Sequence, residues 1–255
     1  MPTWIAYGGT DQGLIRSSNQ DAFLVDNRSG LWAVADGMGG HAGGDIASAL
    51  VIETLAKLAS SLACTSAATE EERSAALTTM VQQAHHAILA YGEAHPEYRN
   101  MGTTLVAAHA SSEIPSQLLI ANVGDSRAYL VRERSITQLT RDHTLVEDYI
   151  RLGYLTPEQA ATHPERHVLT RAMGLGPSVT VDLFPTALQH GDMVILCSDG
   201  LTKMLTEQQI LEIALSSRDT PATLPLELIQ AALANGGIDN VTVVICKVAT
   251  SQEGN

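Results

Sequence analysis

The sequence predicts an α+β domain in which mainly antiparallel sheets are covered by helices. Strand-like stretches recur along the chain, and several neighbours are joined by links too short for the crossover helix that parallel pairing requires. Helical patterns come in pairs, one pair after the first strands and one pair near the end of the chain, which favours helices packed outside the sheets. We expect residues 1–250 to form this single domain and residues 251–255 to be a short tail.

Apolar stretches, either alternating with polar residues or continuous, predict the strands. They lie at residues 4–7, 22–25, 31–35, 103–109, 118–123, 127–131, 136–139, 179–184, 192–197 and 241–247. Their pattern does not give the order of the strands within the sheets.

Apolar positions that recur on one face predict helices at residues 45–62, 206–215 and 221–234. Another helix begins where Thr69 and Glu72 form a capping box, and it runs to about residue 95. Its apolar stripe consists of Leu77, Met80, Val81, Ala84, Ile88 and Tyr91. We interpret His85 and His86 on this helix as ordinary helix positions rather than as ligands.

A long connection, residues 140–178, separates two of the predicted strands. It contains Thr156 followed by Pro157, a pattern typical of a helix start with Thr as the N-cap and Pro in the first turn. Connections of this length in compact domains tend to be functional, so we expect the segment to serve the site.

The charge and hydropathy of the chain exclude several kinds of partner. Its 255 residues include 15 Lys and Arg against 28 Asp and Glu, which gives a formal net charge of −13. We expect no nucleic acid partner, because neutralising phosphates requires clustered basic side chains. No apolar run approaches the roughly 18 residues of a membrane-spanning helix, and no basic segment precedes an apolar one at the start. We therefore expect a soluble, cytoplasmic protein without a membrane partner.

The cysteines give no support to thiol chemistry. Cys64, Cys197 and Cys246 form no CxxC pair, and the last two lie in apolar runs where Cys is usually a small buried hydrophobic residue. None is followed by Arg at the spacing of a cysteine-dependent phosphatase loop.

Aspartates recur where the predicted strands begin or end. They are Asp21, Asp36, Asp125, Asp199 and Asp239. Taken singly, an Asp beside a Gly is most simply a turn residue. If the strand ends share one edge, however, the carboxylates converge, and like charges at close range require cations between them. An oxygen ligand set without His or Cys favours Mg²⁺ or Mn²⁺ over Zn²⁺.

The glycine-rich residues 37–42 offer an alternative, because they match a GxGxxA dinucleotide-binding pattern between a strand and a helix. Two features argue against it. Asp36 would place a carboxylate beside a pyrophosphate, and the helix that follows leads into another helix rather than into a second strand.

Short motifs along the chain resemble those of a known family. They are RSSNQD (16–21), VADGMGGHAGG (34–44), MGTT (101–104), GDSR (124–127), DHT (142–144), CSDGL (197–201) and DNVT (239–242). In this order they resemble the metal-dependent serine/threonine protein phosphatases of type 2C in their compact bacterial form. The resemblance spans nearly the whole chain. It implies an αββα sandwich of two sheets flanked by helix pairs, with a metal centre in a cleft and a flap, residues 140–178, beside it.

Carried over position by position, the resemblance implies a ligand set for two core Mg²⁺ or Mn²⁺ ions and a weaker third ion. Asp36 would bridge the two core ions, and Gly37 would offer its backbone carbonyl to one of them. Asp199 and Asp239 would hold the second ion, while Asp21 would support the first through water. Asp125, together with Asp199, would bind the third ion.

Further residues would act on the substrate. The resemblance implies that Arg16 clamps the phosphate and that His41 is the general acid. In the flap, Arg166, His163 and His167 are possible substrate contacts, although a solvated helix surface would explain these side chains equally well.

The function implied is hydrolysis of phosphoserine and phosphothreonine in proteins by direct attack of a metal-activated water. The substrates would be phosphoproteins made by a serine/threonine kinase, and we expect a monomer. An alternative is a catalytically weak phosphoprotein-binding module of the same fold, whose expected mark is loss of a metal ligand. Asp36, Asp199 and Asp239 are all present. A metal-dependent nuclease would use similar carboxylates, but the net charge disfavours it.

Overall fold

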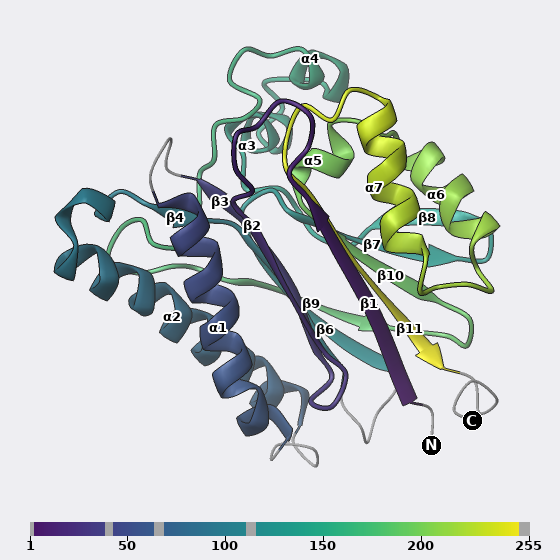
Figure 1. Cartoon of the computed structure of the whole chain (residues 1–255), viewed down its shortest axis with the longest axis horizontal. Coiled ribbons are helices and arrows are strands. Elements are labelled where there is room, and N and C mark those ends of the chain that lie inside the picture. The colour runs from purple at the N-terminus through teal and green to yellow at the C-terminus, as the bar shows by residue number, and fades with distance from the viewer. Residues whose placement is uncertain (1–2, 39–42, 64–68, 111–115, 250–255) are drawn as a thin grey trace.

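Two antiparallel sheets form the centre of the molecule (Figure 1). The computed structural model describes residues 3–38, 43–63, 69–110 and 116–249. In the first sheet the strand order is β1 (Thr3–Asp11), β11 (Val241–Ala249), β10 (Met193–Cys197), β7 (Arg127–Arg132) and β8 (Ser135–Gln138). In the second sheet it is β2 (Asp21–Asp26), β3 (Leu31–Met38), β5 (Leu105–Ala110), β6 (Gln117–Val123) and β9 (Asp182–Ala187), with β4 (Gly102–Thr103) also paired to β3.

Helices cover the outer face of each sheet. On one side lie α1 (Gly44–Ala63) and α2 (Glu70–Ala94), followed by the short 3₁₀ helix η1 (Pro96–Tyr98). On the other side lie α5 (Asp199–Thr202), α6 (Glu207–Ser216) and α7 (Leu224–Ala234). The flap carries α3 (Leu145–Arg151) and α4 (Pro157–Ala161) and sits at one end of the sheets (Figure 1).

Side-chain alternation along the strands produces the layers. In β3, Leu31 and Ala33 pack with α1 and α2, whereas Trp32 and Val34 enter the core between the sheets. In β10 the neighbours Val194 and Ile195 divide in the same way, the first into the inter-sheet core and the second toward the helices of the other side. The αββα four-layer architecture expected from the sequence is therefore confirmed.

Most predicted elements are present with small shifts. The capping box of Thr69 and Glu72 starts α2, and the predicted apolar stripe on this helix is buried apart from the partly buried Tyr91. His85 is buried and its Nδ1 accepts a hydrogen bond from the backbone of Gly174 at 3.0 Å, whereas its Nε2 has no hydrogen-bond partner among the described residues. The short helix α5 was not predicted, because its four residues are too few to show a period.

Two predicted strands differ from the observed ones. The strand expected at 103–109 is interrupted at Thr104, where the backbone N–H of Asp36 bonds the Thr104 side chain rather than its carbonyl. The strand expected at 179–184 begins at Asp182 instead, and Val179 and Thr180 line a cavity.

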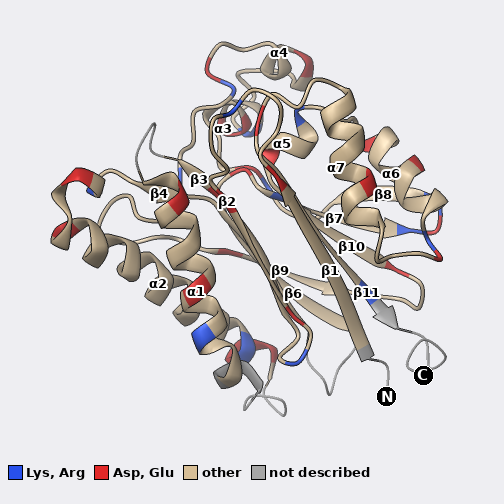
Figure 2. Ribbon diagram, in the orientation of Figure 1, with Lys and Arg blue, Asp and Glu red and all other residues tan. Residues whose placement is uncertain are grey.

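Basic side chains are spread over separate elements in the part of the chain that the structure describes (Figure 2). Within those same residues, no helix combines the length and the apolar character needed to cross a membrane.

Candidate active site

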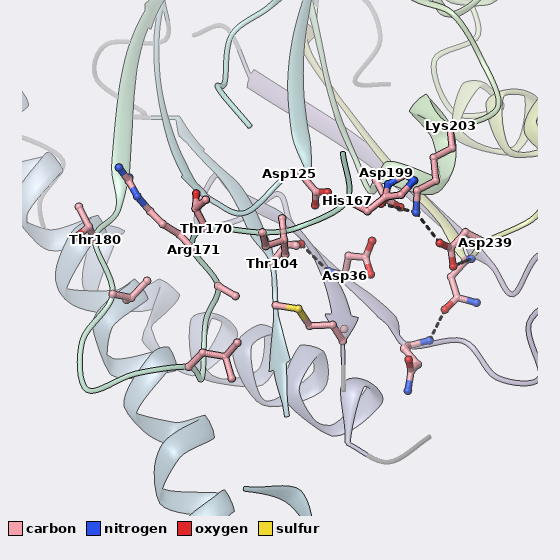
Figure 3. A pocket seen from close by; sticks show the side chains of 18 of the residues that line it. Asp36, Thr104, Asp125, His167, Thr170, Arg171, Thr180, Asp199, Lys203 and Asp239 are labelled. Atoms are coloured by element: carbon pink, nitrogen blue, oxygen red, sulfur yellow. Dashed lines mark hydrogen bonds and ion pairs between the residues drawn. The ribbon is translucent and has the colours of Figure 1, made fainter. Parts of the chain in front are cut away.

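The predicted aspartates converge at the end of the two sheets that lies beneath the flap. Four of them, Asp36, Asp125, Asp199 and Asp239, line one open cavity of about 630 Å³ (Figure 3). Asp21 is paired with Asp36 across β2 and β3 but does not itself line this cavity. Five positions spread over more than 200 residues of sequence thus form one acidic site, as the strand-end argument predicts.

Asp36 lies deep in the site near the end of β3. Its backbone N–H donates to Thr104 Oγ1 at 3.0 Å, and its carbonyl accepts from the Thr103 hydroxyl at 2.9 Å. Thr104 Oγ1 is in turn 2.6 Å from Ser126 Oγ, in the turn that carries Asp125. Burial, and then the charges of Asp21 and Asp199, raise the pKa of the Asp36 carboxyl well above its usual value.

Asp21 joins the two sheets at this point. Its Oδ2 accepts hydrogen bonds from the hydroxyls of Ser198, at 2.8 Å, and Thr242, at 2.7 Å, which lie directly after β10 and in β11 of the other sheet. Its Oδ1 is buried and has no hydrogen-bond partner among the described residues. Burial raises the pKa of Asp21 to about 6, even though the two hydroxyls oppose the shift.

Asp199 and Asp239 share a lysine. Lys203 Nζ lies 2.6 Å from Asp199 Oδ2 and 2.9 Å from Asp239 Oδ2. Arg16 adds a second cation to Asp239, with its Nε 2.7 Å from Oδ1 and its Nη2 3.0 Å from Oδ2. Although burial opposes the shift, these bonds lower the pKa of Asp239. Asp199 Oδ1 is buried and finds no hydrogen-bond partner in the described chain.

Asp125 is held in a tight turn between β6 and β7. The preceding Gly124 has φ of +106°, and a Cβ there would lie 2.7 Å from the Thr104 side chain, so a glycine is required. The Gly124 N–H donates to His143 Nδ1 at 3.0 Å, and His143 Nε2 is 3.2 Å from Asp182 Oδ2. Burial, and then the charges of Asp199 and Asp142, raise the pKa of Asp125 to about 7.

Gly37 presents backbone only, where β3 meets the start of α1. A Cβ at this position would collide with the backbone oxygens of Gly44 and Gln20. The close approach explains why glycine is needed beside Asp36.

Arg16 lies at the mouth of the cavity on a loop fixed by Asn240. The Asn240 side chain donates to the carbonyls of Gln12 and Ser18 and accepts from the Gln20 backbone, with distances of 2.8, 2.9 and 2.9 Å. The Arg16 side chain lines the cavity and pairs with Asp239, while 54% of its surface remains exposed to solvent.

The flap forms the wall of a second cavity of about 830 Å³ that adjoins the acidic site. His167 lines both cavities, and Arg166 lines the second. His163 lines neither of these two cavities and stacks edge-on against Tyr149 within the flap. Two of the three predicted flap contacts therefore face the site. His41, the predicted general acid, lies outside the described residues.

Comparisons with known proteins agree with this geometry. Residues 15–223 match the model of a family described as protein phosphatase 2C. The chain belongs to the protein phosphatase 2C family. It is 39% identical to a serine/threonine phosphatase of Listeria monocytogenes over 96% of each chain. Family membership makes it a protein phosphatase.

Solved structures show the same relationship. The serine/threonine phosphatase PstP of Mycobacterium tuberculosis superposes with a TM-score of 0.85 at 37% identity, covering 97% of this chain and all of that one. A catalytic domain of PstP in complex with two manganese ions matches with a TM-score of 0.82 at 35% identity, covering 98% of this chain and 100% of that chain.

The side chains of this phosphatase fit hard divalent cations. The aspartates offer only oxygen ligands, and burial followed by repulsion from neighbouring carboxylates raises the pKa values of Asp21, Asp36 and Asp125. The unpartnered oxygens of Asp21 and Asp199 also fit a bound cation. Among the described residues, no three His, Cys, Asp or Glu side chains already form a closed ligand group.

The sequence motifs included several supporting residues whose roles only the structure reveals. Thr104 and Ser126 connect Asp36 with the Asp125 turn, and Asn240 fixes the Arg16 loop. Lys203 was missed altogether. Its signal is the spacing of four residues from Asp199, which places both on one face of a helical turn.

Proposed function

We propose that this phosphatase hydrolyses phosphoserine and phosphothreonine in proteins with the help of bound Mg²⁺ or Mn²⁺. The observation that supports this most strongly is the set of partly buried carboxylates around one open cavity, in which Asp199 Oδ1 has no hydrogen-bond partner among the described residues. The cavity opens beside the flap, so a phosphorylated side chain on a protein surface has access to it.

The ligand assignment follows the resemblance. Asp36, Gly37 through its carbonyl, Asp199 and Asp239 would hold two core ions, with Asp21 acting through water. Asp125 and Asp199 would hold a weaker third ion. When bound, two divalent ions lower the pKa of water for in-line attack on phosphorus and neutralise charge on the phosphoryl oxygens.

Arg16 has the position and the spare donors to orient the phosphate. Two of its five N–H groups bond Asp239, which leaves the others for non-bridging phosphate oxygens. A guanidinium presents a planar fork to two such oxygens, which an ammonium does less well. Asp239 thereby holds Arg16 at the mouth of the cavity before a substrate arrives.

The serine or threonine alkoxide that leaves needs a proton. We propose His41 as the donor, because an imidazole titrates near neutral pH and because its loop starts at Asp36 and Gly37. No covalent phosphoenzyme is required in this scheme.

The substrates would be phosphoproteins made by a serine/threonine kinase, and the working form would be a monomer. Light scattering at assay concentrations tests the second statement, since a mass near 27.1 kDa is expected.

Phosphate release from peptides tests the proposed function. The chain is incubated with Mn²⁺ and peptides that carry phosphoserine, phosphothreonine or phosphotyrosine. We expect release from the first two, and little release by an Asp36→Asn variant. A phosphoprotein-binding module would instead bind the peptides and release nothing, which would reject hydrolysis.

A further inference from the structure

Asp199 and Asp239, the two carboxylates assigned above to a core metal ion, are bridged by a side chain of the protein itself. Lys203 Nζ lies within hydrogen-bonding distance of both Asp199 and Asp239, at 2.6 and 2.9 Å (Figure 3). Its backbone N–H donates to the carbonyl of Asp199 at 2.8 Å, which fixes the lysine one helical turn after that aspartate. The turn of α5 therefore places Lys203 beside Asp199, and the two ion pairs hold its ammonium.

We propose that Lys203 is an internal cation that competes with a divalent ion for Asp199 and Asp239. This inference rests on the proposed function, in which these two carboxylates hold one core ion. The ammonium lies 2.6 Å from Asp199 Oδ2, so a divalent ion bound to the same carboxylate would be a like charge only a few Å away. Lysine and metal therefore repel each other at these two carboxylates, and each weakens the binding of the other.

The surroundings allow this exchange. The Lys203 side chain is 24% exposed and borders both the acidic cavity and the cavity under the flap. A flexible four-carbon stem can withdraw its ammonium into the second cavity without movement of the backbone. Arg16 can remain on Asp239 meanwhile, because its guanidinium contacts both carboxylate oxygens and keeps its bond to Oδ1, which Lys203 does not contact.

The consequence concerns the metal-free protein. Four acidic groups line one cavity, and Lys203 offsets part of their repulsion until an ion binds. Removal of the ammonium should therefore weaken the metal-free fold and strengthen metal binding together. If Lys203 only stabilised the structure of the site, its removal would instead lower both the stability of the metal-free protein and its affinity for metal.

The chain supplies a matched control. Lys57 also pairs with an acidic residue four positions away, Glu53, at 3.4 Å, but that pair is exposed on α1. Lys57→Gln makes the same chemical change as Lys203→Gln without touching the acidic site. Lys203→Met keeps the length of the stem and serves if the Gln variant does not fold.

The test is calorimetric titration of Mn²⁺ into the EDTA-stripped and desalted protein, together with thermal unfolding without metal. For Lys203→Gln we expect one Mn²⁺ site to tighten by roughly tenfold and the metal-free melting temperature to fall. Lys57→Gln should change neither. Equal or weaker Mn²⁺ binding by the Lys203 variants, with wild type binding normally, overturns this inference alone. Absence of Mn²⁺ binding to wild type overturns the proposed metal centre and the inference with it.

Discussion

At Asp36 the stability of the metal-free fold and the proposed function favour opposite protonation states. Its carboxylate is buried against other acidic groups, which raises its pKa, while the proposed function needs it ionised between two ions. Asp36→Asn should lower kcat/KM by more than the roughly 10²-fold typical of losing a residue that supports a metal ligand. The same change should stabilise the metal-free protein at pH 8 by about 1 kcal/mol or more, because it removes a buried charge. Steady-state kinetics and urea unfolding check the two effects, and a destabilised Asn variant would contradict the electrostatic part.

His41 can be tested by the choice of leaving group. A serine alkoxide gains much from protonation, whereas nitrophenolate departs without it. His41→Ala should therefore cost about 10²-fold on a phosphoserine peptide and much less on p-nitrophenyl phosphate. Equal losses on both substrates, with chemistry rate-limiting, would show that His41 shapes the loop and donates no proton.

At the scale of single residues, sequence reasoning identified the acidic groups but not their partners. Asp21, Asp36, Asp125 and Asp199 stand out because they flank apolar strands. The bond between Thr104 and Ser126, 22 residues apart, depends on how β5, β6 and the following turn meet, which no local pattern encodes. Lys203 escaped notice because a lone lysine on a short helix is most simply a solvated side chain.

The junction of β3 and α1 depends on Gly37. An alanine Cβ would meet the backbone oxygens of Gly44 and Gln20, so Gly37→Ala must shift the strand end that carries Asp36. We expect a loss of about 1–3 kcal/mol in the free energy of unfolding and weaker Mn²⁺ binding. Gly153→Ala in the flap is the comparison, since φ there is +77° but nothing lies within 4 Å of the added Cβ. It should cost about 1 kcal/mol and leave Mn²⁺ binding unchanged. Calorimetry that finds equal Mn²⁺ affinity in both variants would contradict this role of Gly37.

The flap should contribute to substrate binding through Arg166 more than through His163. Arg166 lines the cavity that adjoins the acidic site, whereas His163 packs against Tyr149. Arg166→Ala should raise KM for a phosphopeptide several-fold and change KM for p-nitrophenyl phosphate little. His163→Ala is the control for general loss of flap structure. The prediction fails if both variants alter both substrates alike.

For helices and strands, hydrophobic periodicity predicted those elements in which buried positions recur regularly along the sequence. It failed where a tertiary contact decides the backbone. The side chain of Thr104 interrupts one strand by bonding Asp36, and residues 179–181 lie outside the sheet, where Val179 and Thr180 line the cavity. The sheet order likewise depends on long-range pairing, such as β1 with β11.

The free energy of unfolding of the metal-free protein should depend on pH, and bound metal should remove the part of this dependence that comes from Asp125. Burial raises the pKa of Asp125 to about 7, so the folded metal-free protein binds a proton there that the unfolded chain has lost. This contribution is complete below about pH 4 and disappears as the pH rises through 7. Buried histidines act in the opposite sense, since the pKa of His109 is lowered to about 4. Comparison with Asp125→Asn separates the two effects.

We expect the stability advantage of metal-free Asp125→Asn over wild type to grow between pH 5 and pH 8, by about 1 kcal/mol or more in total. Saturating Mn²⁺ should remove this advantage at pH 8. Denaturant unfolding at several pH values measures both. An advantage that is constant with pH would show that the Asp125 carboxyl does not titrate in this range.

The proposed function requires that aspartates from both sheets hold the divalent ions on which phosphate release depends. The most direct measurement follows phosphate release from a phosphothreonine peptide while Mn²⁺ is titrated into the EDTA-stripped protein, with occupancy measured by calorimetry under the same conditions. We expect no turnover without metal and activity that rises as two Mn²⁺ sites fill, with the activity and the filling of the sites both lost in Asp36→Asn. Full turnover by the stripped protein, or filled sites without phosphate release, would contradict it.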